Sequence, residues 1–283
     1  MQGILDRQNE PRMLEIQFSA RHFFNRAEKV SILTTYLAFI PLLALLPFPN
    51  DWLNIVNLVA LAIDATVIFL IARTHKLVNQ GATLRAYFDS YVLQVKTDSY
   101  DKVFIKNIDT TVYNIMQKYA KKATLESQND GSGVLPGVKN WYEPQNATSH
   151  NDAVRQCQVL NKDWDKDLNK YRIIRLTVFA IILIAIEVLL IFIFKVTWYN
   201  ILFATGQLVL RLVERIVAYI KFIAQSLAID SLAEALEADP SKSNQKVFQR
   251  AIDKRRRIPV LGSKSGHKKN AKKLSDKYKA VMK

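Results

Sequence analysis

The chain has 283 residues, of which 49% are hydrophobic, and a formal net charge of +15. This combination argues against an ordinary soluble domain, and a disordered chain would be much less apolar. The one cysteine, Cys157, excludes an intrachain disulfide, and the four scattered histidines show no spacing typical of zinc ligands. We therefore expect no metal site and no cofactor, and we expect the apolar and basic residues to be segregated along the chain.

The N-terminal part predicts a helix followed by a membrane hairpin. Residues 1–30 are amphipathic and lack a small-residue cleavage site, which indicates a cytoplasmic helix and not a cleaved signal. Two apolar runs follow, Ile32–Phe48 and Leu53–Ala72, each close to the roughly 20 residues that cross about 30 Å of hydrocarbon as a helix. A short turn ending in Trp52, an interfacial type of residue, separates them. Residues 31–73 are therefore predicted to form transmembrane helices 1 and 2.

The next segment, residues 74–172, predicts a cytoplasmic region of helical arms. Its apolar side chains recur at helical spacing, with a cap and break expected at Thr97-Asp98. A second helix, Asp152–Arg172, is expected to run directly into the third span. A loop that holds Trp141 and Tyr142 should join the two arms.

A second membrane hairpin is predicted over residues 173–228. The third span, Ile173–Val196, is the most apolar stretch, and the fourth begins at Ile201 but is interrupted by charges. A charge at bilayer depth costs roughly 2.5–3.5 kcal/mol, so these side chains should face other helices or water. The polar residues within the spans are Asp64, Glu187, Arg211, Glu214 and Arg215. They either pair across the bundle (Asp64 or Glu187 with Arg211) or line a polar path for ions or water.

The distribution of basic residues predicts the orientation. Lysines and arginines flank the outer ends of the spans, whereas the two short turns contain only Lys195, and basic flanks are retained in the cytoplasm. We expect a multi-pass protein of the inner (plasma) membrane with both termini cytoplasmic. Residues 229–283 are predicted to be a basic cytoplasmic tail, solvated and attracted to anionic lipids. The predicted class is an all-α integral membrane protein with four transmembrane helices and a helical cytoplasmic region.

Basic and aromatic residues gather in the cytoplasmic segment. This mixture suits a nucleotide, because arginine and lysine bind phosphates and aromatic rings stack on bases. The alternative is that Trp141 and Trp164 merely close the top of a helical bundle. No nucleophile and base can be paired, so no enzyme is expected. The candidate ligand-binding residues are Lys139, Trp141, Tyr142, Arg155 and Trp164.

A pattern of aromatic, amide and basic residues precedes the third span and extends to both ends of the chain. It consists of Gly137–Tyr142, Ala153–Gln158, Asn161, Trp164-Asp165, Leu168 and Tyr171, with Gln8-Asn9, Arg21, Ile252, Arg255-Arg256 and Pro259 as flanking elements. This pattern resembles the SMODS-associated four-transmembrane effector family of bacteria.

The resemblance implies a membrane effector of cyclic-oligonucleotide anti-phage defence. Such an effector would bind a cyclic di- or oligonucleotide messenger made by a partner nucleotidyltransferase. It would then assemble into a homo-oligomer and permeabilise the inner membrane, killing the infected cell. Membrane lipids are expected as partners, and a DNA or RNA polymer is not. The alternatives are a constitutive ion channel or transporter subunit, and a membrane scaffold that forms no pore.

Overall fold

Every regular element in the described part of the chain is helical. The computed structural model describes residues 2–45, 50–97, 100–130, 136–194 and 198–261. The helices are α1 (Gln2–Gln8), α2 (Pro11–Leu37), the 3₁₀ helix η1 (Ile40–Leu45), α3 (Asn50–Leu93), α4 (Lys102–Gln128), α5 (His150–Phe194), α6 (Trp198–Ala238) and α7 (Lys242–Arg256). The predicted all-helical class is confirmed for these residues.

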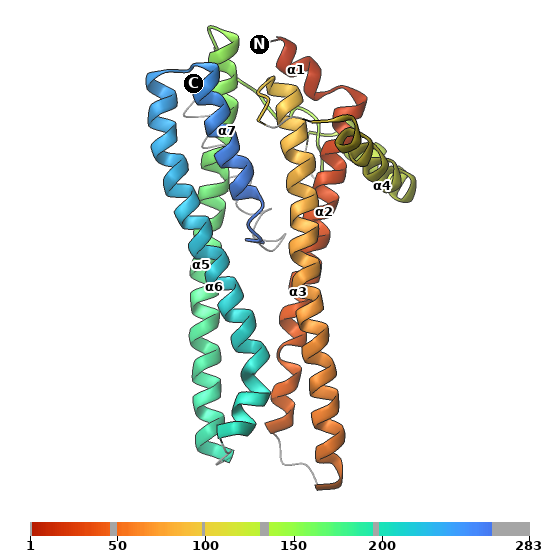
Figure 1. The fold of residues 1–283 in the computed structure, drawn as a ribbon, viewed down its shortest axis with the longest axis vertical. Coiled ribbons are helices and arrows are strands. Elements are labelled where there is room, and N and C mark those ends of the chain that lie inside the picture. Colours follow the sequence, from red (N-terminus) through yellow and green to blue (C-terminus); the bar gives the residue numbers. More distant parts are fainter. Residues whose placement is uncertain (1, 46–49, 98–99, 131–135, 195–197, 262–283) are drawn as a thin grey trace.

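Four long helices form two antiparallel hairpins that run the length of the molecule, α2 with α3 and α5 with α6 (Figure 1). The ends of α3 and α5 that contain Asn50 and Phe194 lie at one end of the molecule, while α1, α4 and α7 lie toward the other (Figure 1). We call the half that contains residues 32–72 and 173–210 the stem. The half that contains α1, α4, residues 136–149 and α7 is called the head.

α3 and α5 pass from the head into the stem without a break. α5 extends from His150 to Phe194, as expected for an arm that enters the third span. α3 has 44 residues, or about 66 Å at 1.5 Å per residue. Each of these two helices is therefore part of both the head and the stem.

The first apolar run is not one regular α-helix. α2 ends at Leu37, and the chain continues as η1. Pro41 explains the change, because it has no N–H and its ring clashes with the carbonyl four residues earlier. The predicted helix over Ile32–Phe48 is therefore an α-helix only to Leu37 and a 3₁₀ helix over Ile40–Leu45, and residues 46–48 of that run lie outside the described residues.

The predicted break within the first arm is confirmed, but its cap is a different residue. α3 ends at Leu93, and α4 begins after Asp101, whose Oδ1 accepts a 2.7 Å hydrogen bond from the backbone N–H of Phe104. Asp98 lies outside the described residues. α4 packs on α2 and contains a non-helical residue, Tyr119, at which it kinks.

The region after α6 is folded, so the prediction of a solvated tail is wrong for residues 242–261. Phe248 and Ile252 of α7 are completely buried against α6. Apolar and amide residues recur here every three or four positions inside the basic run, which forms an amphipathic helix despite its charge. The part of α6 that receives α7 consists of Ile229, Ala233 and Leu236.

The stem carries apolar surface that the chain itself does not cover. Two of the described helices are long and apolar enough to cross a membrane, α3 over Ile55–Leu93 and α6 over Thr205–Ala238. Only 6% of the most apolar stretch of α3 is buried, in contrast to the core helix of a soluble domain. Large uncovered apolar surfaces are unfavourable in water and mark contact with lipid or protein. The exposed apolar side chains include Leu58, Leu61, Phe69, Ile181, Leu189 and Phe192.

Candidate functional site

The loop between α4 and α5 is fixed to the N-terminus by paired amides. The Gln8 side chain accepts a 2.7 Å hydrogen bond from the backbone N–H of Tyr142 and donates a 2.9 Å bond to its carbonyl oxygen. The Asn9 side chain accepts a 3.1 Å hydrogen bond from the backbone N–H of Asn140 and donates a 2.8 Å bond to the side-chain Oδ1 of Asn140. Asn140 has a φ of 51°, a left-handed conformation that asparagine tolerates better than most residues. Gln8, the last residue of α1, and Asn9, which follows it, thus define the course of this loop.

Tyr142 is the centre of the loop and is completely buried. Its hydroxyl donates a 2.6 Å hydrogen bond to Oδ1 of Asp89 and accepts a 2.7 Å bond from the side-chain amide of Asn161. Its ring stacks on Phe88, with centroids 6.2 Å apart. Burial and the adjacent Asp89 carboxylate raise the pKa of Tyr142, so the hydroxyl remains a neutral donor.

Asp89 connects this loop to α7. Its Oδ2 accepts a 3.0 Å hydrogen bond from Gln249 and forms an ion pair with Arg256. Gln249 also donates to Oδ1 of Asp253 at 3.0 Å and accepts a 3.1 Å bond from Gln158 of α5. A buried carboxylate is tolerated because it is paired and hydrogen-bonded in this way.

We call these side chains the head network. Its members come from α1, α3, the loop around Tyr142, α5 and α7, so it couples α3 to α5 through α7. Arg255 strengthens the α5 contact, because its Nη2 donates to the carbonyl oxygens of Asn161 and Lys162 at 3.1 and 3.2 Å. The head network consists of Gln8, Asp89, Tyr142, Gln158, Asn161, Gln249, Asp253 and Arg256.

The predicted ligand-binding residues have different environments. Trp141 is 39% exposed, and the Arg85 guanidinium lies 3.7 Å from its ring centroid as a cation–π contact. Lys139 is exposed on the same loop. Tyr142 is inside the head network, where it positions the loop and presents no ring surface to a ligand.

Arg155, on α5, is held by its own helix. Its guanidinium forms a 2.7 Å ion pair with Asp152, four-fifths of whose side chain is buried. This contact lowers the pKa of Asp152. The side chain of Trp164 lies outside the described part of the structure. The ligand-binding role of these residues stays a prediction.

A second polar cluster joins the hairpins below the head. Arg211 of α6 is 3% exposed, donates a 2.6 Å hydrogen bond to Glu214, and donates to the carbonyl and hydroxyl of Ser31 at 3.0 and 2.7 Å. Arg215 also donates to the Ser31 hydroxyl, and Glu214 contacts His75 at 3.2 Å. We call these five residues the boundary cluster.

The boundary cluster lies at the head end of the predicted spans. Ser31 immediately precedes the first span, and His75 lies just beyond the end of the second. The three charged residues of α6 therefore lie level with these two positions and not at the middle of the predicted spans.

Deeper in the stem, Asp64 does not pair with Arg211. Among the described side chains, the partners of Arg211 are Glu214 and Ser31. Oδ1 of Asp64 is buried and has no hydrogen-bond partner within the described residues. The side chain of Glu187 lies outside the described part.

Sequence reasoning missed three members of the head network, Asp89, Gln249 and Asp253. The one local signal is the four-residue spacing of Gln245, Gln249 and Asp253, which places them on one face of a helix. Asp89 gives no such signal, because its partners are distant in the sequence.

One family model matches the chain over residues 2–205, a region that includes α1 to α5 and the start of α6. No curated protein and no solved structure was found that matches it. The matched region contains both elements of the first hairpin, the loop around Tyr142 and all of α5. The chain therefore belongs to the family of SMODS-associating 4TM effector domains, and its uncovered apolar stem is that of a membrane effector.

Proposed function

We propose that this protein binds a cyclic oligonucleotide messenger at its head, assembles into an oligomer and permeabilises the bacterial inner membrane, which kills the infected cell. The observation that carries the proposal is the head network. Several residues of the sequence pattern that resembles the family lie in one buried network that connects the two hairpins. They include Gln8, Tyr142, Asn161 and Arg256. A ligand that rearranges this network acts on both hairpins at once.

The exposed side of the loop is the proposed contact surface for the messenger. Lys139 and Trp141 are exposed and lie just before the buried Tyr142, and Arg155 and Trp164 lie on α5, the next helix. Trp141 offers an aromatic ring already paired with Arg85, and such a pair can bind a base and a phosphate together. Because Tyr142 follows Trp141 directly in the chain, a ligand that moves Trp141 strains the hydrogen bonds of Tyr142.

The proposed consequence is a change in helix packing in the stem. A ligand shifts a conformational equilibrium only if it binds one state better than the other. The loop belongs to the head network, whose Asp89 lies on α3 and whose Gln158 lies on α5. Since both helices continue into the stem, the state favoured by the messenger has a different arrangement of spans two and three.

The permeability path is proposed to include the polar residues of the stem and its boundary. In the resting arrangement Arg211, Glu214 and Arg215 are paired with one another and with Ser31. On opening, water would replace these contacts. Asp64 and Glu187, which lie in the adjoining spans, would line the same path. The uncovered apolar faces of α3 and α5 would contact lipid or neighbouring subunits.

A liposome assay tests this function directly. Dye-loaded liposomes that carry the purified protein should leak when a cyclic oligonucleotide is added, and the double variant Trp141→Ala, Arg155→Ala should abolish the response. A matched control is Tyr113→Ala with Lys121→Ala, which removes an exposed aromatic and an exposed basic residue from α4. Leakage that survives in the Trp141/Arg155 variant would refute the assigned surface.

A constitutive ion channel is the second candidate function, and Asp64 is the observation that favours it. A buried carboxylate oxygen without a partner in the described residues is a feature of ion pathways within membranes. This function predicts conductance without any nucleotide and a loss of that conductance in Asp64→Asn. Conductance that requires a nucleotide would exclude it.

A further inference from the structure

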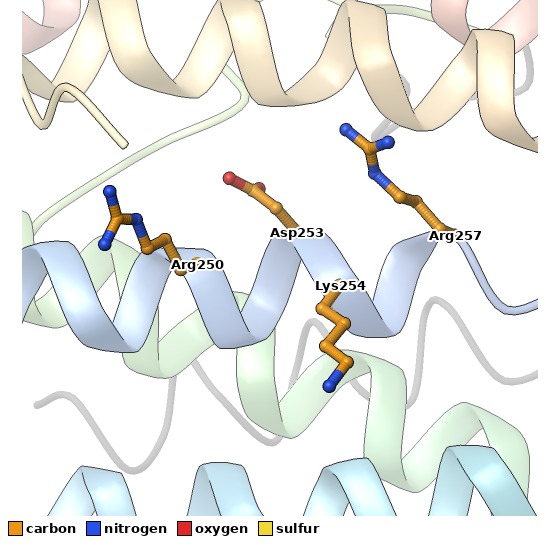
Figure 2. Close-up of a pocket in the computed structure, with 4 residues that line it drawn as sticks. All are labelled: Arg250, Asp253, Lys254 and Arg257. Atoms are coloured by element: carbon orange, nitrogen blue, oxygen red, sulfur yellow. The ribbon is translucent and has the colours of Figure 1, made fainter. Parts of the chain in front are cut away.

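α7 carries a small pocket beside the head network. The pocket has a volume of about 210 Å³ and is lined by Arg250, Asp253, Lys254 and Arg257 (Figure 2). Asp253 and Arg257 project from the same side of α7, whereas Lys254 leaves the opposite side (Figure 2). Three basic residues around one acid give the pocket a positive potential.

The two arginines are held at their positions by neutral acceptors. Arg250 donates through Nε and Nη2 to the carbonyl oxygen of Thr97, at 3.0 and 2.8 Å. Arg257 donates through Nη1 to Oδ1 of Asn79, at 3.3 Å. A guanidinium has five N–H donors, so each arginine keeps donors for an anion. Both contacts span from α7 to α3 or to the segment just after it.

Asp253 contributes a buried carboxyl group to the wall of the pocket. The residue is only 8% exposed, and its Oδ1 accepts from Gln249 and Arg256 at 3.0 and 3.4 Å. Its Oδ2 is buried and has no hydrogen-bond partner within the described residues. Because Oδ2 is covered, the Asp253 carboxyl acts on an anion in the pocket through its charge, and protonation removes the repulsion.

The surroundings of Asp253 favour the protonated form. Burial raises its pKa to about 7, with a further contribution from Asp89 of α3, while Arg256 and Arg257 oppose the shift. Gln249 is the neutral neighbour that links the two carboxyl groups. Below about pH 7 the acid is therefore mostly neutral and does not repel an anion.

We infer that this pocket binds a phosphate group, with Arg250 and Arg257 as charged donors and the Asp253 carboxyl facing the same anion. Its volume is below the roughly 300–1,000 Å³ typical of small-molecule pockets, so it holds a phosphate and leaves the rest of the ligand outside. The inference deepens the proposed function, and the identity of the natural ligand rests on that function. If the ligand is the messenger, its phosphodiester would connect α7 with α3. A lipid phosphate is the other source, because Asn79 lies one turn beyond His75 of the boundary cluster.

The first experiment uses inorganic pyrophosphate as the probe and the full-length protein in detergent. The ³¹P signal should broaden on binding, and the double variant Arg250→Gln, Arg257→Gln should weaken the affinity at least about tenfold, the usual scale of a lost charged hydrogen bond. Lys246→Gln is the matched control, because it removes one charge from an exposed position of the same helix, outside the pocket. Equal binding by wild type and double variant would overturn the inference.

A further variant separates the role of Asp253 from overall charge. Asp253→Asn is permanently neutral, so it should bind pyrophosphate more tightly than wild type at pH 8 and about equally at pH 6. The ratio between the two proteins cancels the ionisation of the probe itself. A ratio that does not change with pH would remove Asp253 from the site.

Competition identifies the source of the phosphate. Cyclic diadenylate that displaces pyrophosphate indicates a messenger phosphodiester, and displacement by phosphatidylglycerol nanodiscs but not by phosphatidylcholine nanodiscs indicates a lipid. Either result supports the phosphate site. Because no leakage is measured here, pyrophosphate binding in a protein that never permeabilises liposomes would contradict the proposed function alone.

Discussion

The hydroxyl of Tyr142 donates a 2.6 Å hydrogen bond to Asp89, and both side chains are completely buried. This bond joins a loop residue to α3, the helix that continues into the second predicted span. Asp89 also binds Gln249 and Arg256 of α7. One carboxylate therefore connects the loop, the first hairpin and α7.

Removing the Tyr142 hydroxyl should destabilise the head. In Tyr142→Phe, Oδ1 of Asp89 and the amide of Asn161 lose their shared partner in the interior, which costs about 1–3 kcal/mol. Thermal unfolding in detergent should show a lower midpoint than wild type. The control is Tyr113→Phe, because Tyr113 is 62% exposed on α4 and should change the midpoint very little. Equal midpoints for the two variants would contradict the role of the Tyr142 hydroxyl.

The stability of the head should depend on pH through Asp253. An aspartate in an unfolded chain titrates near pH 4, whereas burial raises the pKa of Asp253 to about 7. The folded protein thus binds more protons between these values, so the stabilising contribution is complete below about pH 4 and is lost as pH rises through about 7.

Asp253→Asn has no proton to lose at this position. Its unfolding midpoint, relative to wild type, should rise as the pH increases from 5 to 8. Thermal unfolding of both proteins in the same detergent measures the difference and cancels the other titrating groups. A difference that is constant with pH would show that Asp253 titrates normally.

The boundary cluster should depend on Arg211 more than on His75. Arg211→Ala leaves Glu214 without its closest partner and the hydroxyl of Ser31 without one of its donors, and breaking a buried ion pair costs about 3 kcal/mol or more. His75→Ala also removes a contact of Glu214, but its side chain is 49% exposed, and such pairs contribute below about 1 kcal/mol. Unfolding by denaturant in detergent should rank the variants in this order. A larger loss in His75→Ala would contradict it.

Lipid should protect the stem and leave the head accessible. Leu61 of α3 and Tyr113 of α4 are 65% and 62% exposed, so the chain itself shields them to the same degree. In native membranes a water-soluble maleimide should label Tyr113→Cys and not Leu61→Cys. The native Cys157 is buried, and burial raises the pKa of its thiol, which keeps it unreactive. Both cysteines should react after denaturation, and rapid labelling of Leu61→Cys in intact membranes would argue against its span.

The sequence by itself predicted the features that depend on local composition. The apolar run Leu53–Ala72 is long enough to make one helix favourable in hydrocarbon, wherever the rest of the chain lies. The continuity of α5 and the break before α4 also follow from periodicity and capping within a few residues. Pro41 was a local signal as well, and its effect on the first span could have been predicted from the missing N–H.

The tertiary structure alone decided which polar residues meet. Asp89 binds Tyr142 and Arg256, and Arg211 binds Ser31, although each pair is far apart in the sequence. The tertiary structure also shows that part of the expected basic tail is the helix α7, because Phe248 and Ile252 pack against an apolar surface of α6. Partition into a membrane depends on the summed transfer free energy of a local segment, whereas a buried polar contact depends on packing that brings distant groups within about 3 Å.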